Sequence, residues 1–288
     1  MTLDDIFSSF RESVVDLGLY QRAAKATAKK ELQQLNQYAE QLKSNPAIEG
    51  FGSSSDAMYF YDPRTGTARN YGFRESSVED RVKLVLFQKN KQYCWLLAEA
   101  YEEFEDYLEA TYAYLGSQDT SSWLMSDFGN ISITDLVDKD YAWYLDRAKN
   151  KRDAPQSILT RLRALYPQLV DVETNNKLNV NLKLAIELIA HLRHIIVHRG
   201  GLVASRGTFL ESVLKKCGLW NNGKYHKGYE VFVHKFFGGG EYENTISLLE
   251  IRVHPEIPLD IHHDLFGEVT GYLMAYAVLV YEIASGKA

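Results

Sequence analysis

The stretch of sequence that decides the fold is NVNLKLAIELIAHLRHIIVHRGG, residues 179–201. Its Leu, Ile, Val and Ala residues cover a broad arc of a helix, which indicates that the helix is largely buried. Gly200 and Gly201 supply a stop signal, and His198 and Arg199 stand in the last turn, where the helix dipole favours cations. We therefore expect one buried helix over about 180–199.

Further helical patterns lie on both sides of this stretch. Good helix formers dominate residues 2–43, and Asn45-Pro46 ends that pattern. A second pattern begins at a Ser76–Glu79 capping box and runs over about 77–115. It is longer than a usual globular helix, so we expect a kink or a break within it. Its acidic face, from Glu99 to Glu109, is expected to be solvated. Shorter helices are predicted over about 141–150, 155–166 and 261–284.

Two other segments have the composition of β-structure. Residues 57–73 hold two aromatic runs around a Pro-Arg-Thr-Gly turn and predict a β-hairpin. The rings either form a stacking platform for unpaired bases or pack on the helices, and packing is the simpler interpretation. Residues 224–237 and 241–258 are two further β-rich runs joined by a glycine turn. The residues that make the hairpin suitable for stacking are Tyr59, Tyr61, Tyr71 and Phe73, interleaved with Arg64, Arg69 and Arg74.

Together these patterns predict a mainly α-helical protein with two β-rich additions. The expected order is an N-terminal helical arm (1–44), a loop and hairpin (45–76), a helical core (77–201), a β-rich insert (202–258) and a C-terminal core helix (259–288).

Charge is distributed unevenly along the 288 residues. The net charge is −6, which argues against a protein that coats nucleic acid by bulk charge. Residues 99–146 hold twelve acids against one Lys (net −11), whereas residues 193–235 hold eight Lys or Arg against two acids (net +6). A confined basic stretch fits a phosphodiester ligand. A second basic cluster comprises Arg147, Lys149, Lys151, Arg152, Arg161 and Arg163.

Cysteine usage and the apolar segments indicate the compartment. Cys94 and Cys217 have no CxxC spacing, so we expect two small buried residues in a reducing compartment rather than a disulfide scaffold or zinc ribbon. Acids come early at the N-terminus and no apolar run follows, which is unlike a secretory signal. The longest apolar stretch, 272–284, is shorter than the roughly 20 residues that span a bilayer. We therefore expect a cytoplasmic protein with no membrane partner.

The chemistry-bearing residues gather in the buried helix, where Arg193 lies close to three histidines. Glu187, His191, His194 and His198 share one helical face and can contribute ligands to a metal ion, although Arg193 beside them would repel it. A structural role is a second interpretation, because Arg193 can pair with an acid and histidines stabilise a helix end. The third is metal-free RNA cleavage, in which Arg binds phosphate and His takes the proton of a ribose 2′-hydroxyl.

The motif Arg193-x4-His198, with the polar His194 directly after the arginine, resembles the signature of HEPN domains (higher eukaryotes and prokaryotes nucleotide-binding). Asn is commoner than His at the position of His194. The YEEFEDYL stretch, residues 101–108, is also similar to an HEPN core helix. The resemblance covers roughly residues 81–200 and the final helix.

The resemblance implies a helical bundle that pairs as a homodimer, with both motifs in one cleft at the interface. Catalytic members are metal-independent endoribonucleases without a cofactor, often toxins or antiviral defence effectors. Carried onto this chain, His198 is the general acid or base, Arg193 stabilises the transition state and His194 is an auxiliary donor. Weaker candidates for RNA contacts are Arg199, Lys215 and Lys216. The alternative is a non-catalytic HEPN module that binds a nucleotide or a partner, for example a nucleotidyltransferase antitoxin.

The spacing of the motif makes a geometric prediction. Five residues turn a helix by about 500°, which leaves Arg193 and His198 roughly 140° apart. Either the helix loosens before His198, or the working pair forms across a dimer.

Overall fold

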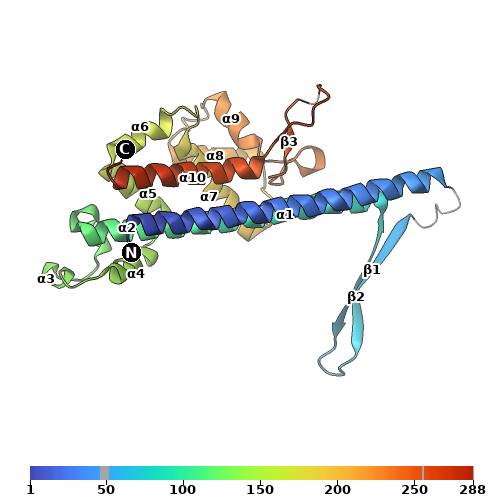
Figure 1. Ribbon diagram of the computed structural model, residues 1–288, viewed down its shortest axis with the longest axis horizontal. Coiled ribbons are helices and arrows are strands. Elements are labelled where there is room, and N and C mark those ends of the chain that lie inside the picture. Colours follow the sequence, from blue (N-terminus) through green and yellow to red (C-terminus); the bar gives the residue numbers. More distant parts are fainter. Residues whose placement is uncertain (46–51, 255, 288) are drawn as a thin grey trace. The chain divides into compact units, whose positions relative to one another are not determined.

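The computed structural model describes residues 1–45, 52–254 and 256–287, and within them the chain is mainly helical, as predicted (Figure 1). Short 3-10 turns at Thr120–Ser122, Met125–Asp127 and Gly240–Tyr242 connect some of the elements. The elements are, in order, α1 (Leu3–Ser44), β1 (Ser53–Tyr61), β2 (Ala68–Ser77), α2 (Val78–Gln118), α3 (Ile133–Leu136), α4 (Tyr141–Lys149), α5 (Ala154–Leu165), α6 (Pro167–Thr174), α7 (Leu182–Arg199), α8 (Arg206–Cys217), α9 (Lys227–His234), β3 (Ile251–Arg252), β4 (His262–His263) and α10 (Leu265–Ala284).

The chain divides into two compact units. Unit 1 consists of residues 1–19 and 93–288, and unit 2 consists of residues 20–92. The long helices α1 and α2 each contribute one part to each unit. A helical pattern shows where a helix is, and the contacts between helices decide which parts belong together.

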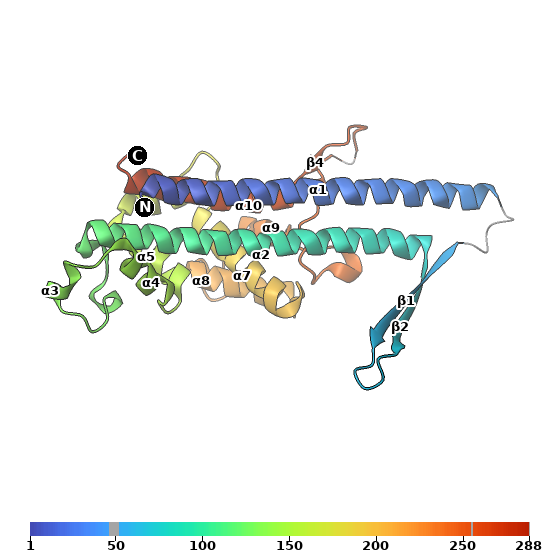
Figure 2. The same cartoon turned by 60° about the horizontal axis from the view of Figure 1, so that its bottom comes forward.

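The core of unit 1 is built from α2, α7 and α10 together with the start of α1 (Figure 2). From α2, Leu97, Phe104 and Leu108 are completely buried, as the 3.6-residue stripe predicts. Helix α7 packs on α6, α8 and α10 and is buried over most of its length, which confirms the prediction for residues 180–199. The ring of Phe10 on α1 lies 5.1 Å from that of Tyr107 on α2, so α1 closes this core.

Helix α2 is continuous over 41 residues, so the expected break is wrong. Sharp kinks need Pro, a Gly or Ser pair, or an inserted group, and α2 has no Pro and no Gly before Gly116. Its N-terminal box is Ser77 with Asp80, one residue later than predicted: the Asp80 N–H donates to Ser77 Oγ at 3.1 Å and the Ser77 N–H to Asp80 Oδ2 at 3.1 Å. Glu79 and Asp80 both have a carboxylate that can complete a capping box. Because the helix starts at Val78, Ser77 is the cap and Asp80 is its partner.

The insert over residues 202–258 contains the helices α8 and α9, which corrects part of the β-rich prediction. The first expected strand run, 224–237, contains α9, in which Val233 is buried, and Phe237 after the helix forms an isolated bridge with Ile246. The β-branched and aromatic residues of this run favour strands by composition, and the tertiary context overrides that preference. The second run forms β3 and isolated bridges, and β3 pairs with β4 in a small antiparallel sheet.

Unit 2 contains a helical pair and a β-hairpin. Ala28, Leu32 and Leu35 of α1 pack against Val82 and Val85 of α2. The hairpin strands β1 and β2 pair antiparallel, as predicted, with one bulge. Nearly every hairpin side chain is exposed, so the simpler expectation that its aromatics pack on the helices is wrong. Within the segment 45–76, where a loop and a hairpin are predicted, residues 46–51 lie outside the described residues.

Two further predictions concern cysteines and membrane spans. Cys94 and Cys217 are both buried and unpaired, as expected, and burial raises the pKa of each thiol to about 12. In the part of the chain that the structure describes, no helix combines the length and the apolar character needed to cross a bilayer.

Candidate functional site at the end of α7

Helix α7 remains regular through the whole motif. Asn181 caps its start, with Oδ1 accepting from the Leu184 N–H at 2.9 Å. At the other end Gly200 adopts φ 61°, and its N–H and that of Gly201 both return to the carbonyl of Ile195. The helix therefore does not loosen before His198, and Arg193 and His198 lie on different faces of one regular helix. The alternative in which the helix loosens is therefore wrong, and a working pair across a dimer stays a prediction.

Arg193 is half-buried and held by α2. Its Nη2 lies 2.9 Å from Glu102 Oε1, and the arginine side chain is 25% exposed. Its Nε is buried and has no hydrogen-bond partner in the described part of the chain. Arg193 thus pairs with an acid of α2, as the structural interpretation expects. The Nε–H donor of its guanidinium remains unused within the described residues.

A second carboxylate, Glu105, lies near the same guanidinium. Burial raises the pKa of Glu105 to about 7, although the nearby charge of Arg193 acts in the opposite direction. Sequence reasoning treated all acids on this helix as one solvated face. Glu102 and Glu105 stand three apart, so they share a side of α2, and only the docking of α7 shows that this side meets Arg193.

Glu105→Gln is expected to raise the thermal unfolding midpoint more at pH 8 than at pH 5. The folded-state pKa lies above the ordinary value of 4.5, so folding favours the protonated carboxyl. Its stabilising contribution is fully present below pH 4.5 and is lost as the pH rises through about 7. Glutamine copies the neutral form and removes the cost of ionisation. Calorimetry at both pH values checks this, with exposed Glu99→Gln as control; an equal shift at both pH values would contradict the raised pKa.

His194 and His198 form an exposed pair one turn apart, with ring centroids separated by 4.7 Å. Partial desolvation lowers the pKa of His194, and the positive charges of His198, His191 and Arg199 act in the same direction. A lowered histidine pKa favours the neutral ring, which is the form that accepts a proton. Arg199 is exposed in the same last turn, so two imidazoles and a cation are open to a ligand.

The two weaker candidates on α8 are exposed but not joined to the histidines. Lys215 forms an ion pair with Glu211 at 2.6 Å, and Lys216 is exposed. No hydrogen bond or ion pair of the described residues links either lysine to Arg193 or His198.

The third histidine, His191, lies on a different side of α7. Its Nε2 lies 3.2 Å from Ser212 Oγ on α8, and its Nδ1 lies 3.3 Å from Glu187 Oε1. The four residues of the metal alternative therefore do not converge, and within the described ranges no cluster of three or more His, Cys, Asp or Glu is placed to hold a metal ion.

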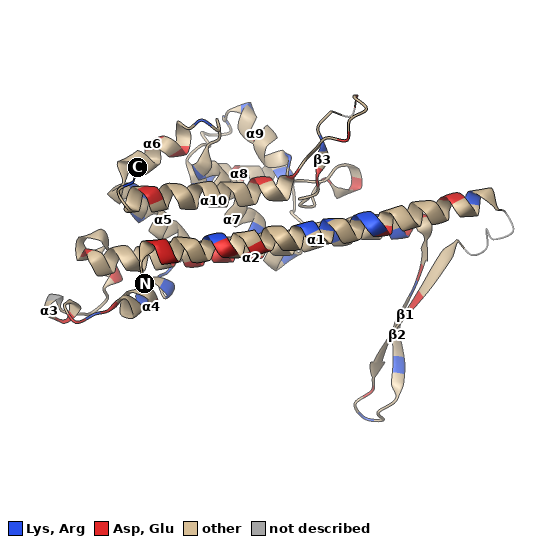
Figure 3. Cartoon of the chain, viewed as in Figure 1, with Lys and Arg blue, Asp and Glu red and all other residues tan. Residues whose placement is uncertain are grey.

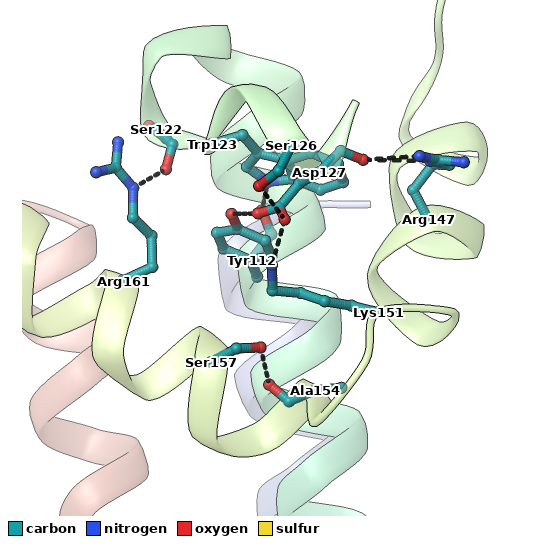
Figure 4. A network of polar contacts seen from close by, with 10 residues as sticks. All are labelled: Tyr112, Ser122, Trp123, Ser126, Asp127, Arg147, Lys151, Ala154, Ser157 and Arg161. Carbon is teal, nitrogen blue, oxygen red and sulfur yellow. Dashed lines mark hydrogen bonds and ion pairs between the residues drawn. The ribbon is translucent and has the colours of Figure 1, made fainter. Parts of the chain in front are cut away.

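Most cations of the basic cluster between Arg147 and Arg163 pair with groups of the protein itself (Figure 4). Lys151 forms an ion pair with the nearly buried Asp127, which also accepts from the Tyr112 hydroxyl at 2.5 Å. Arg147 donates to the Asp127 carbonyl at 3.1 Å, and Arg161 donates to that of Ser122 at 2.8 Å. These donors hold the 119–128 loop beside a small cavity of about 280 Å³.

Two further members of this cluster are paired as well. Arg163 Nη2 lies 2.7 Å from Glu173 Oε1, which also accepts from the Tyr276 hydroxyl at 2.6 Å. Lys149 pairs with Asp106 at 3.4 Å. Of the six cations, Arg152 is the one whose side chain is almost fully exposed, at 97%. The cluster therefore stabilises the fold and leaves little charge for a phosphate.

The site at the end of α7 thus contains two open imidazoles, an open guanidinium and a second guanidinium shared with Glu102. No protein-family model matches the chain, and the searches of curated proteins and of solved structures found no significant relative.

Proposed function

We propose that the protein is a metal-independent endoribonuclease of HEPN type. The observation that carries the proposal is the exposed His194–His198 pair, which lies beside Arg199 at the end of the helix that also holds Arg193. Two neighbouring imidazoles can act as base and acid without a metal ion. Cations next to them favour an anionic backbone as the substrate.

The proposed reaction starts with the ribose 2′-hydroxyl of the RNA. The neutral ring of His194 suits the base that takes the hydroxyl proton, and the 2′-oxygen forms a bond to the adjacent phosphorus. The bond from phosphorus to the 5′-oxygen breaks, and His198 supplies the proton that this leaving oxygen needs. The products are a 2′,3′-cyclic phosphate and a free 5′-hydroxyl. Arginine stabilises the additional negative charge of the transition state.

A homodimer completes the proposed site. Arg193 points toward α2, whereas His198 is exposed on another face of α7. One chain therefore does not bring the two motif residues together, and a second copy can place its arginine beside the first copy's histidines.

The proposal is tested by incubating purified protein with RNA in EDTA and identifying the ends. Cleavage that persists and leaves 2′,3′-cyclic phosphate supports it. Cleavage that stops in EDTA, or that leaves 3′-hydroxyl ends, would refute it. RNA binding without cleavage would favour the second candidate, a non-catalytic module, for which the engagement of Arg193 by Glu102 is the favourable observation.

Glu102→Gln is expected to tighten RNA binding by roughly 2- to 5-fold. The glutamate competes with phosphate for Arg193, and a partly exposed ion pair contributes up to about 1 kcal/mol. Fluorescence anisotropy with labelled RNA in the His198→Ala background measures the effect without cleavage. Glu99→Gln removes the same charge one turn away, and an equal gain from it would show that long-range charge alone is responsible.

A further inference from the structure

The β1–β2 hairpin of unit 2 exposes aromatic rings on both of its faces. Tyr59 and Tyr61 alternate with Phe60 along β1, so they lie on the face opposite Phe60. Phe73 pairs in register with Ala57 and therefore joins the face of Tyr59 and Tyr61. Tyr71, at the bulge, contacts Phe60 with ring centroids 6.3 Å apart. The exposed fraction of these five rings ranges from 45% for Phe60 to 78% for Tyr61.

The hairpin is held together by the pairing of its two strands and by its turn. Asp62 is buried and pairs with both Arg64 and Arg69, at 3.1 Å and 3.0 Å. Gly66 takes φ +66°, which the turn requires and a side chain would strain. Exposed aromatic rings gathered on one small hairpin indicate a binding site, because folding leaves them in water.

Arginines accompany the rings on the strands. Arg69 pairs in register with Phe60 and Arg74 with Asp56, so both lie on the face of Phe60, opposite Tyr59, Tyr61 and Phe73. Arg69 also forms an ion pair with Asp62. Aromatic rings with cations nearby stack on bases and bind phosphates at the same time.

The whole of unit 2 is basic although the chain is acidic (Figure 3). Residues 20–92 contain twelve Lys or Arg against eight acids (net +4), whereas the remainder contains twenty against thirty (net −10). On the helical pair, Lys30 and Arg81 line an open hollow of about 520 Å³, together with Tyr38 and Glu31. This charge difference favours an anionic occupant for unit 2 over an acidic or apolar one.

We propose that the hairpin is a binding site for single-stranded RNA, with bases stacked on Tyr59, Tyr61 and Phe73 and phosphates bound by the basic helical pair. The inference rests on the proposed function, because RNA is the substrate there. Under this inference, unit 2 binds the unpaired RNA. Base stacking on rings tolerates any sequence, so this site selects unpaired RNA rather than a particular sequence.

The test measures binding of a labelled single-stranded RNA by the full chain in the His198→Ala background. The paired change Tyr59→Leu and Tyr61→Leu is expected to weaken binding at least about tenfold, because stacking contributes about 1–3 kcal/mol per base. Tyr59→Phe with Tyr61→Phe keeps both rings and should bind like the parent. Leucine variants that bind RNA like the parent would overturn the inference, as would a parent protein that binds no RNA.

Two further measurements secure the outcome. Ultraviolet crosslinking of RNA to the unaltered chain is expected to label peptides from residues 52–77, and it needs no variant to fold. Vesicles containing anionic lipid are a second probe, and ring-dependent vesicle binding without RNA binding would overturn the inference. If the hairpin binds RNA but the wild type cleaves none, the inference stands and the ribonuclease proposal fails. If cleavage occurs and crosslinks avoid the hairpin, the inference alone fails.

Discussion

His198→Ala is expected to reduce RNA cleavage by at least about 10²- to 10⁴-fold, because a positioned acid or base contributes that much to a proton-transfer step. Arg193→Ala should cost about 10²- to 10³-fold, the usual loss when one donor to a transition-state anion is removed. Cleavage of a labelled RNA in EDTA measures both rates. Matched controls are His254→Ala, an exposed histidine of the loop that follows β3, and Arg152→Ala, an exposed arginine; both should cleave like the wild type.

Mixing the two inactive variants tests how the site is assembled. If a site takes Arg193 from one chain and His198 from the other, a mixed dimer of Arg193→Ala and His198→Ala chains contains one intact site. Partial recovery of cleavage on mixing is therefore expected. Recovery cannot occur if each site uses both residues of one chain. If each single variant cleaves RNA like the wild type, the motif is not the active site.

The second large effect concerns stability. Arg163→Ala is expected to lower the free energy of unfolding by about 3–5 kcal/mol, because it leaves the carboxylate of Glu173 buried without its cation. The pair joins α5 to α6, and the hydroxyl of Tyr276 on α10 completes the network. Urea or thermal unfolding of the full chain measures the loss.

A matched cation and a double variant make this result interpretable. Lys149→Ala breaks an exposed pair with Asp106 and should change stability by less than about 1 kcal/mol. Arg163→Met combined with Glu173→Gln removes both charges and should cost less than Arg163→Ala alone, since no unpaired ion stays buried. Equal losses from Arg163→Ala and Lys149→Ala would contradict the network.

Most of the secondary structure could be read from local patterns. The helices over 2–43, 141–150, 155–166 and 180–199 end within about two residues of their predicted limits, because apolar periodicity, caps and Gly or Pro stops are properties of the chain itself. The hairpin follows from its turn residues in the same way. Helices α6 and α8 were not predicted, and α9 was misread as a strand because its β-branched and aromatic residues favour strands by composition.

Only part of the candidate site could be predicted from the sequence. Arg193 and the three histidines stood out because such residues are uncommon in an apolar helix. Their partners did not: Glu102, Glu105 and Ser212 come from helices distant in sequence, and nothing in their local pattern separates them from solvated neighbours. The same holds for the basic run 147–163. Its charges are engaged by Asp127, Glu173 and backbone carbonyls, and the local sequence does not show these contacts.

The sequence by itself determined which segments are helices, where the hairpin turns and where the unusual polar residues of α7 lie, because each depends on neighbours within a few positions. Only the tertiary structure decided which of those polar residues are free. Docking of α7 against α2 and α8 engages Arg193 and His191 and leaves His194 and His198 exposed. The hairpin rings stay in solvent because no helix covers them in the described part of the chain. Burial and pairing depend on contacts between distant segments, and a one-dimensional pattern does not contain them.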